Sequence, residues 1–266
     1  MTTESLFTFM ERYIQEEFEE EAVLKESSRG VIRKVRHKES HRRYVCREFE
    51  GSAQIYLALR GKECMYLPRI YEAAQEDVPG ELPGESLHRR GIVLEECLVG
   101  DTLAMLLQAG PLTKRQVKDI SIQICKGLYV LHTMGWVHRD IKPQNVMICG
   151  NRAVLIDFDA ARYCNLDPEG ENDIRLMNVR RKDAVKKQDT RILGTVGYAP
   201  PEQYGISETD YRADIYAVGV LINEMLTGLH PSQKLARGHW GRIVSRCTMA
   251  SPDKRYNSVR ELMEVL

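Results

Sequence analysis

The pattern of apolar residues changes near Gly100, and this change limits the folds that the chain can adopt. Before Gly100, short runs of strand-forming residues alternate with polar stretches, and the runs lie at residues 31–36, 44–49, 67–73 and 91–96. After Gly100, apolar residues recur at steps of three or four, as on one helix face, at Val117, Ile120, Ile124, Leu128 and Leu131. The chain is therefore expected to be α+β and bilobal, with a small strand-rich lobe at residues 1–96, a connection at 97–101 and a larger helical lobe at 102–266.

Further elements can be placed within each lobe. The first two strands are expected to form a hairpin through the polar residues 37–43. Thr113 and Gln116 form a capping-box signature, which predicts the start of a helix that ends near Gly135. Additional helices are expected at residues 5–21, 52–59, 214–226 and 260–266, and short strands at 146–148 and 154–156.

Charge is balanced overall but uneven along the chain. Lys plus Arg and Asp plus Glu each total 38, so no net field attracts nucleic acid or an acidic membrane. Residues 1–22 hold seven Glu and one Arg, whereas residues 29–47 hold eight Lys or Arg and one Glu. The simplest interpretation of both runs is solvated surface. Nucleic-acid binding by the basic run is a weaker hypothesis, because Tyr44 is the only aromatic residue there that can stack on a base.

The chain shows no sign of a membrane span or of a secreted scaffold. No apolar run approaches the ~20 residues that a membrane helix needs, and the N-terminus lacks the pattern of a signal peptide. The seven cysteines are scattered, odd in number and never spaced as Cys-x-x-Cys. This usage favours reduced thiols over disulfides or a zinc site. We expect a cytoplasmic protein that binds neither nucleic acid nor membrane.

Four polar residues downstream of the long helix have the types and the order that phosphoryl transfer needs. Asp140 can accept a hydroxyl proton, and Lys142 can lie beside the transferred phosphate. Asn145 and Asp157 offer hard oxygen ligands, which suit Mg²⁺ that arrives largely paired with nucleotide phosphates. These four residues are therefore candidates for catalysis and for metal binding.

Two motifs carry a family resemblance. Residues 138–145 read His-Arg-Asp-Ile-Lys-Pro-Gln-Asn, and this run resembles the catalytic loop of eukaryotic-like, bacterial-type serine/threonine protein kinases. Residues 194–202, with the sequence Gly-Thr-Val-Gly-Tyr-Ala-Pro-Pro-Glu, are similar to the family's substrate-facing loop. The resemblance implies a bilobal protein kinase fold over residues 1–266, with a hinge at residues 97–101, that uses ATP and Mg²⁺. It also implies catalytic roles for Asp140, Lys142 and Asn145, and a metal site at Asn145 and Asp157. Lys142 looks like the serine/threonine branch of the family.

The resemblance also implies contacts in the C-terminal half. Glu202 is expected to form an ion pair with Arg255. Two residues are expected at the start of a buried central helix, Asp214 and Gly219. Residues 159–198 form a segment in which self-phosphorylation is expected, and Thr190 is the favoured site.

The small lobe matches the family less well. The family's glycine-rich loop lets backbone amides approach phosphates, but at residues 25–30 only Gly30 remains. Arg47 stands where the family has a phosphate-binding lysine, and Gln54 where it has that lysine's helix glutamate. Asp159 replaces the glycine of the Asp-Phe-Gly motif. Because aspartate adopts positive φ more readily than most residues, the backbone turn is expected to persist.

Glu95 takes a position that is normally apolar, at the rear of the family's nucleotide pocket. A buried carboxylate without a partner is unfavourable, so we expect Glu95 to pair with Arg47 and to replace the missing helix glutamate. The alternative is that the alignment is displaced by one residue and Glu95 faces solvent. The full set of nucleotide-binding residues that the resemblance implies is Gly30, Arg47, Glu95, Glu96, Leu98, Asn145 and Asp157.

Two functions from different classes fit these residues. An active kinase, a transferase that moves the γ-phosphoryl group of ATP to a protein hydroxyl, is favoured because the residues that touch the chemistry are all present. The alternative is a pseudokinase, a binding module without phosphoryl transfer, because Arg47, Gln54 and Asp159 depart from the family on the nucleotide-holding side. The sequence does not identify the substrate protein.

Overall fold

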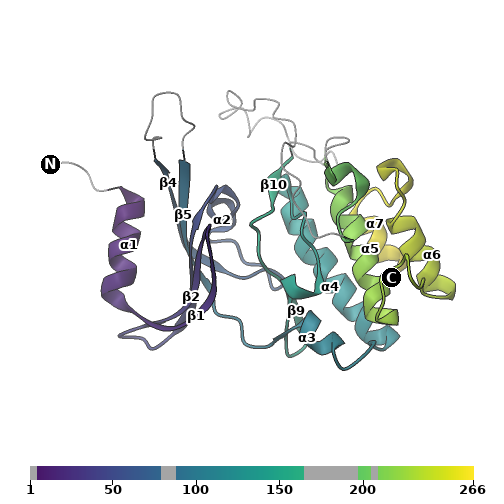
Figure 1. Cartoon of the computed structure of the whole chain (residues 1–266), viewed down its shortest axis with the longest axis horizontal. Helices are drawn as coiled ribbons and strands as arrows, with labels where there is room; N and C mark the ends of the chain where they lie inside the picture. Colours follow the sequence, from purple (N-terminus) through teal and green to yellow (C-terminus); the bar gives the residue numbers. More distant parts are fainter. Residues whose placement is uncertain (1–4, 79–87, 165–196, 205–208) are drawn as a thin grey trace. The chain divides into compact units, whose positions relative to one another are not determined.

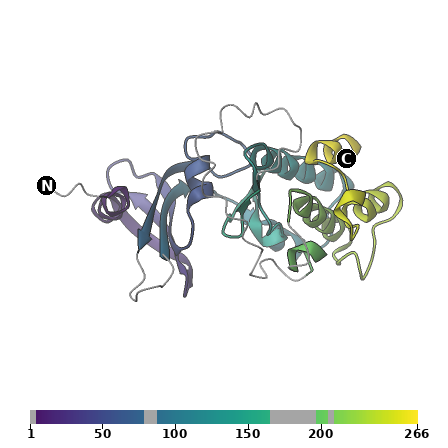
Figure 2. The ribbon, with the colours of Figure 1, turned by 90° about the horizontal axis from the view of Figure 1, so that it is seen from above.

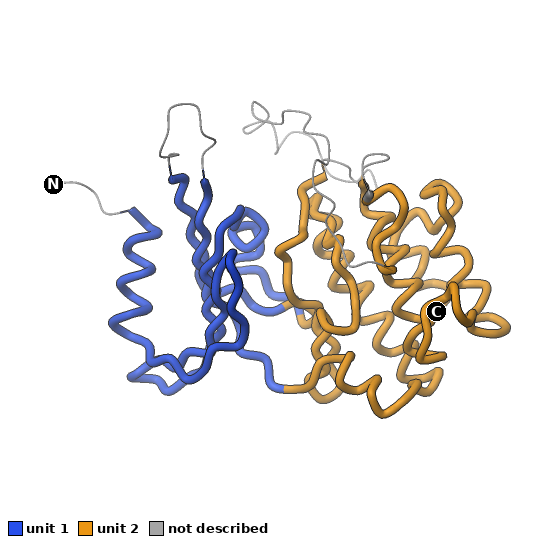
Figure 3. Tube along the Cα trace, viewed as in Figure 1, with its two compact units in different colours: residues 1–64, 68–99 blue, residues 65–67, 100–266 orange. Residues whose placement is uncertain are grey.

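The computed structural model describes residues 5–78, 88–164, 197–204 and 209–266. The chain divides into two compact units (Figure 3): unit 1 comprises residues 1–64 and 68–99, and unit 2 comprises residues 65–67 and 100–266. The boundary after Val99 falls within the expected connection at 97–101. The role of that connection as a hinge stays a prediction, and each unit is described by itself.

Unit 1 is a five-stranded antiparallel sheet with two helices. Its elements are α1 (Leu6–Glu17), β1 (Phe18–Ser27), β2 (Gly30–His37), β3 (Arg43–Glu50), α2 (Gln54–Leu59), β4 (Ile70–Val78) and β5 (His88–Glu96). The strand order is β1-β2-β3-β5-β4. The expected hairpin of β2 and β3 is confirmed, and the helix expected at 52–59 is α2. The strand expected at 67–73 begins later, at Ile70, and continues to Val78.

The prediction of one acidic helix over residues 5–21 is wrong beyond Glu17. The chain leaves the helix at Phe18, whose backbone is extended, and continues as β1. Phe18 is buried, and its ring meets those of His37 and Tyr44 edge-on, at centroid distances of 5.0 and 5.6 Å. Burial of this ring under α1 favours a strand where the local sequence favours a helix.

The acidic and basic runs of the sequence face each other across β1 and β2. Ion pairs join Glu19 to Arg36 at 2.6 Å and Glu20 to Arg33 at 3.0 Å. Because these side chains are partly exposed, each pair contributes at most about 1 kcal/mol to stability. The acidic and basic runs therefore pair in part with each other on a partly exposed surface.

The two faces of the sheet are covered by different helices (Figures 1 and 2). The helix α1 covers one face, where a core forms from Phe7, Met10, Phe18, Val35, Cys46, Ala74, Ile92 and Leu94. The helix α2 lies on the other side, where Tyr56 packs against Phe49 with ring centroids 5.6 Å apart. Since side chains alternate along a strand, Arg47 shares the face of Phe49.

Unit 2 is mainly helical. Its helices are α3 (Leu103–Leu107), α4 (Lys114–Thr133), α5 (Arg212–Thr227), α6 (Gly238–Cys247) and α7 (Val259–Val265), with 3₁₀ turns η1 (Pro143–Asn145), η2 (Pro201–Tyr204) and η3 (Pro252–Lys254). Its short strands are β6 (Asp101–Thr102), β7 (Trp136–Val137), β8 (Val146–Cys149), β9 (Arg152–Leu155) and β10 (Arg162–Tyr163). The strands form two small sheets, of order β6-β8-β9 and β10-β7.

The long helix begins and ends as the sequence predicts. The Thr113 hydroxyl accepts the Gln116 N–H at 3.3 Å, and the Gln116 amide oxygen accepts the Thr113 N–H at 3.0 Å. The helix ends before Gly135, which has φ of +78° and so adopts the left-handed conformation that glycine tolerates. None of the helices in the described ranges combines the length and the apolar character of a membrane span.

The helix α5 is the buried centre of unit 2, with α4 and α6 packed on it (Figure 1). The predicted buried helix at 214–226 is thereby confirmed. A Cβ atom added to Gly219 would lie 2.3 Å from the Cβ of Cys247 on α6. Glycine at this position therefore allows the close approach of α6.

We expect Gly219→Ala to destabilise the protein by about 1–3 kcal/mol, because the added methyl group overpacks the contact with Cys247. In an unpacked helix the same change stabilises by about 1 kcal/mol, so the sign is diagnostic. Urea unfolding followed by circular dichroism measures the effect. An increase in stability would show that α6 does not press on α5.

Candidate functional site

The three predicted catalytic residues come together in the loop between β7 and β8. The Lys142 ammonium lies 2.7 Å from Asp140 Oδ2. The Asn145 side-chain nitrogen donates to the same oxygen at 2.9 Å and to the Asp140 backbone carbonyl at 2.8 Å. The orientation of the Asp140 carboxylate is therefore set by a cation and an amide from its own loop.

Asp214 on α5 holds the backbone of this loop. Its carboxylate is fully buried and accepts the N–H groups of His138 at 2.9 Å and Arg139 at 2.8 Å. The His132 Nε2 atom lies 2.9 Å from the same carboxylate. Burial raises the pKa of Asp214, but the hydrogen bonds from His132 and from the loop backbone outweigh burial, so its pKa is lowered. The ionised carboxylate thus anchors the loop, including Arg139 with its positive φ of +70°.

His138 links the loop to the segment that carries Asp157. Its Nδ1 accepts the Asp140 N–H at 3.3 Å, so the proton of the neutral ring belongs on Nε2, which donates to the Ile156 carbonyl at 3.3 Å. Burial lowers the pKa of His138 despite three nearby carboxylates. A neutral ring is required here, because a proton on Nδ1 would break the contact with Asp140.

Asp157 is placed by the residue before it. The Ile156 N–H donates to the Asn145 carbonyl at 2.9 Å, and the Ile156 carbonyl accepts from His138. Asp157 itself has φ of +68°, which is strained for a residue other than glycine. The expected turn persists through the bond from the Ala161 N–H to the Phe158 carbonyl at 2.9 Å, but its positive φ lies at Asp157 and not at Asp159.

The chemistry of Asn145 and Asp157 fits Mg²⁺. Both hydrogen bonds of the Asn145 side chain use its nitrogen, which leaves the amide oxygen as a hard ligand. Over the described ranges, His, Cys, Asp and Glu side chains form no group of three or more that suits a metal ion. One carboxylate and one amide suit a cation whose remaining ligands are phosphate oxygens and water.

The predicted ion pair of unit 1 is confirmed. Arg47 Nε lies 2.6 Å from Glu95 Oε1, and the two residues are 6% and 4% exposed. The register of β3 and β5 sets Arg47 opposite Val93, so Arg47 and Glu95 are diagonal neighbours on one face. The alternative that Glu95 faces solvent is excluded, and Gln54 is exposed at the first residue of α2.

Three other predicted nucleotide-site residues of unit 1 have local structural roles. A Cβ on Gly30 would lie 2.1 Å from the Glu48 carbonyl, so close pairing with β3 already requires glycine there. Glu96 is half-buried, and its carboxylate accepts the Arg69 N–H at 3.2 Å. Leu98 is half-buried after the end of β5. Their contacts with a nucleotide stay predictions.

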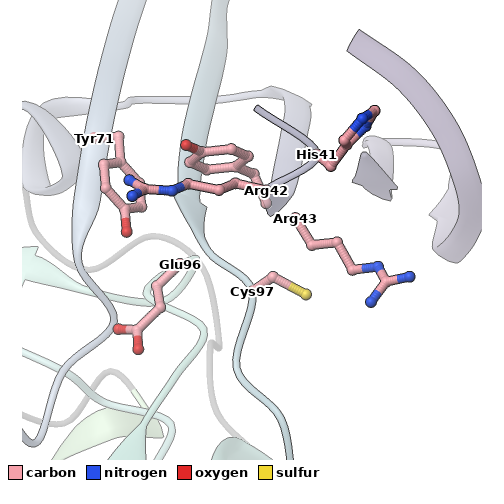
Figure 4. Close-up of a pocket in the computed structure, with 7 residues that line it drawn as sticks. His41, Arg42, Arg43, Tyr71, Glu96 and Cys97 are labelled. Atoms are coloured by element: carbon pink, nitrogen blue, oxygen red, sulfur yellow. The ribbon is translucent and has the colours of Figure 1, made fainter. Parts of the chain in front are cut away.

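Sequence reasoning did not find a pocket beside Glu96 and Cys97 (Figure 4). The other residues that line it are His41, Arg42, Arg43, Tyr44 and Tyr71. The Tyr44 and Tyr71 rings meet edge-on at 5.1 Å, and burial raises the pKa of Cys97. The lining residues come from separate strands and a turn, so no local sequence motif marks this pocket.

The predicted pair of Glu202 and Arg255 is also confirmed. The two side chains are buried and joined by two hydrogen bonds, of 2.5 and 2.9 Å. Tyr198 also donates a hydrogen bond to Glu224 on α5. These contacts attach residues 197–202 to the helical core, whereas Thr190 lies outside the described residues.

Comparisons with known proteins agree with this geometry. Residues 18–262 match the family model of the protein kinase domain. The serine/threonine-protein kinase PknA of Nostoc sp. is 30% identical over 193 residues, which are 65% of this chain and 32% of that protein. The serine/threonine-protein kinase pkn2 of Myxococcus xanthus is 32% identical over 152 residues, 56% of this chain and 16% of that protein. The chain spans about a third or less of the length of these curated relatives.

We expect Asp214→Asn to destabilise the protein by about 1–3 kcal/mol, because an amide nitrogen would face a buried N–H donor of the loop. Exchange of the His138 and Arg139 amide hydrogens should also become faster. Urea unfolding and hydrogen exchange with mass spectrometry measure the two effects. Unchanged protection of this loop would contradict the anchoring role of Asp214.

We expect His138 to make the folded state less stable as the pH falls below its ordinary pKa of 6.5. The folded pKa is lowered, so the unfolded state binds the proton first and the stabilising contribution, complete above 6.5, is lost at lower pH. Urea unfolding between about pH 7.5 and about pH 5.5 should therefore give a steeper loss for wild type than for His138→Gln. His88→Gln, at an exposed residue of β5, should keep the wild-type slope. Equal slopes for wild type and His138→Gln would contradict the neutral state of His138.

Proposed function

The chain belongs to the protein kinase domain family, and we propose that it transfers the γ-phosphoryl group of ATP to a serine or threonine hydroxyl of a protein. The observation that carries this proposal is the oriented carboxylate of Asp140, held by Lys142 and Asn145. Phosphoryl transfer depends on such positioning more than on covalent help from the protein.

In the proposed reaction, the substrate hydroxyl donates its hydrogen bond, and then its proton, to the Asp140 carboxylate. The hydroxyl oxygen forms a bond to the γ-phosphorus while the bond to the β-phosphate oxygen breaks, so ADP leaves with that electron pair. Lys142 stabilises the negative charge of the transferred group. Its ammonium already lies 2.7 Å from Asp140 Oδ2, which sets both groups for one reacting centre.

Asn145 and Asp157 would hold the Mg²⁺ of this reaction. The cation supplies charge neutralisation at the phosphate oxygens. The strained backbone of Asp157 supports this assignment, since strain of this kind is concentrated at functional sites. For the nucleotide we propose Arg47 as the phosphate-binding cation, with Gly30, Glu95, Glu96 and Leu98 as the remaining residues of unit 1.

The setting of the reaction is part of the proposal. All seven cysteines are free, which supports a cytoplasmic location because thiols stay reduced there. We propose a protein substrate and no nucleic-acid partner, because the basic residues of β2 are paired with glutamates of β1. Self-phosphorylation within residues 159–198, with Thr190 as the favoured site, completes the proposal.

We expect purified wild-type protein to gain phosphate when it is incubated with ATP and Mg²⁺, and Asp140→Asn to gain none, since the amide cannot accept the hydroxyl proton. Intact-mass spectrometry measures the added phosphate, and phosphosite mapping identifies serine, threonine or tyrosine. A mixture of peptides with each hydroxyl type serves as substrate beside self-phosphorylation.

If wild type binds nucleotide but neither protein gains phosphate and no peptide is modified, the proposed kinase activity is wrong and the pseudokinase alternative takes its place. Phosphate on both proteins would show contamination by another kinase and would remove the support for Asp140. Modification of tyrosine alone would contradict the serine/threonine assignment.

A further inference from the structure

We propose that Glu95 is a positioning residue that holds Arg47 from within the sheet, so that nucleotide binding does not depend on the position of α2. This inference rests on the proposed function, in which Arg47 binds nucleotide phosphate. It concerns how the site of unit 1 is kept in a binding-competent state.

The pair is built into the hydrogen-bonded centre of the sheet. The strands β3 and β5 pair without interruption from Tyr44 opposite Glu96 to Glu50 opposite Arg90. Arg47 and Glu95 both lie inside this ladder, and both are more than nine-tenths buried. Their 2.6 Å contact is therefore set by the register of two adjacent strands. The backbone positions of the two residues can move apart only if these strands separate or slip.

The helix α2 has no carboxylate that could take the place of Glu95. In the protein kinase family the phosphate-binding lysine pairs with a glutamate on a helix, so movement of that helix makes or breaks the pair. Here α2 reads Gln-Ile-Tyr-Leu-Ala-Leu over residues 54–59 and contains no carboxylate. The carboxylate that the family has on a mobile helix lies here on the strand β5, as Glu95.

The helix α2 is also attached to β4 at both ends. At its start, the Gln75 side-chain oxygen accepts the Ala53 N–H at 2.9 Å. Just after its end, the Gly61 N–H donates to the Ile70 carbonyl at 3.3 Å. Between these contacts, its apolar side chains are buried, namely Ile55, Tyr56 and Leu59. A helix of this length, held at each end, has little freedom to move away from the sheet.

The pair has a function beyond filling the core. A buried ion pair adds little to stability compared with apolar residues of similar volume, whereas loss of one partner leaves an uncompensated charge. Glu95 therefore keeps a cation in a position where the sheet alone would favour an apolar side chain. An arginine that binds phosphate has to be kept in place as a cation, and Glu95 does this for Arg47.

The test uses calorimetric binding of ADP with Mg²⁺, which does not require phosphoryl transfer. Glu95→Gln should raise the dissociation constant at least tenfold, because Arg47 loses its charged partner. Glu48→Gln is the matched control, since it removes a glutamate that pairs with Arg33 at 2.5 Å in the same sheet, and it should stay within twofold of wild type. Gln75→Ala loosens the start of α2 and should also stay within twofold.

Two further variants separate positioning from folding. Glu95→Asp keeps the compensating charge but moves it back by one methylene, so it should fold like wild type and still bind ADP more weakly. Exchange of the pair, Arg47→Glu with Glu95→Arg, should restore thermal stability relative to Glu95→Gln without restoring ADP affinity, because the cation has moved to β5. Recovery of affinity in the exchanged variant would overturn the proposal.

The outcomes distinguish this inference from the proposed function. Wild type that gains phosphate while Glu95→Gln and Glu95→Asp bind ADP normally would overturn the positioning role and leave the kinase activity standing. Weak ADP binding by Gln75→Ala, equal to that of Glu95→Gln, would show that α2 controls the site. If wild type binds ADP in a way that depends on Glu95 but transfers no phosphate, the positioning role is supported and the proposed kinase activity is overturned. No ADP binding by wild type would overturn both.

Discussion

The carboxylate of Asp214 is the contact on which the geometry of the catalytic loop depends. It lies at the start of α5, in the centre of unit 2, and fixes the N–H groups of His138 and Arg139. With these two residues fixed, the direction of Asp140 is set, and His138 extends the same constraint to Ile156 and so to Asp157. A loop anchored in this way has the rigidity of the helical core, which precise positioning requires.

Much of this arrangement follows from local sequence signals. The capping box at Thr113 and Gln116 and the all-round apolar pattern of α5 are properties of short segments, so one chain is enough to predict them. The gathering of Asp140, Lys142 and Asn145 follows from their closeness in sequence. The pairing of Glu202 with Arg255 came only from the family resemblance, since 53 residues separate them.

The elements that sequence reasoning missed are decided by contacts between distant segments. Glutamate has a high helix propensity, so the run at 19–21 favours a helix until β2 supplies arginine partners and a place for Phe18. The helix α6 contains Gly238 and Gly241, which weaken a helix prediction, yet a Cβ on Gly241 would lie 2.1 Å from the Ala236 carbonyl. The close packing therefore requires glycine at residue 241, although glycine weakens the prediction of a helix there.

The departures of unit 1 from the family pattern are better explained by a change of ion-pair partner, with Glu95 in place of the helix glutamate, than by loss of the nucleotide site. Loss of the helix glutamate alone would leave a buried cation without compensation, which is strongly destabilising. An apolar residue in place of Arg47 would have removed the buried charge, and no carboxylate would then be required at Glu95. The sheet instead contains both charges, at a separation of 2.6 Å. Stability alone gives little reason to keep the pair, and this supports the proposal that Arg47 binds phosphate, a ligand that a fixed guanidinium suits well.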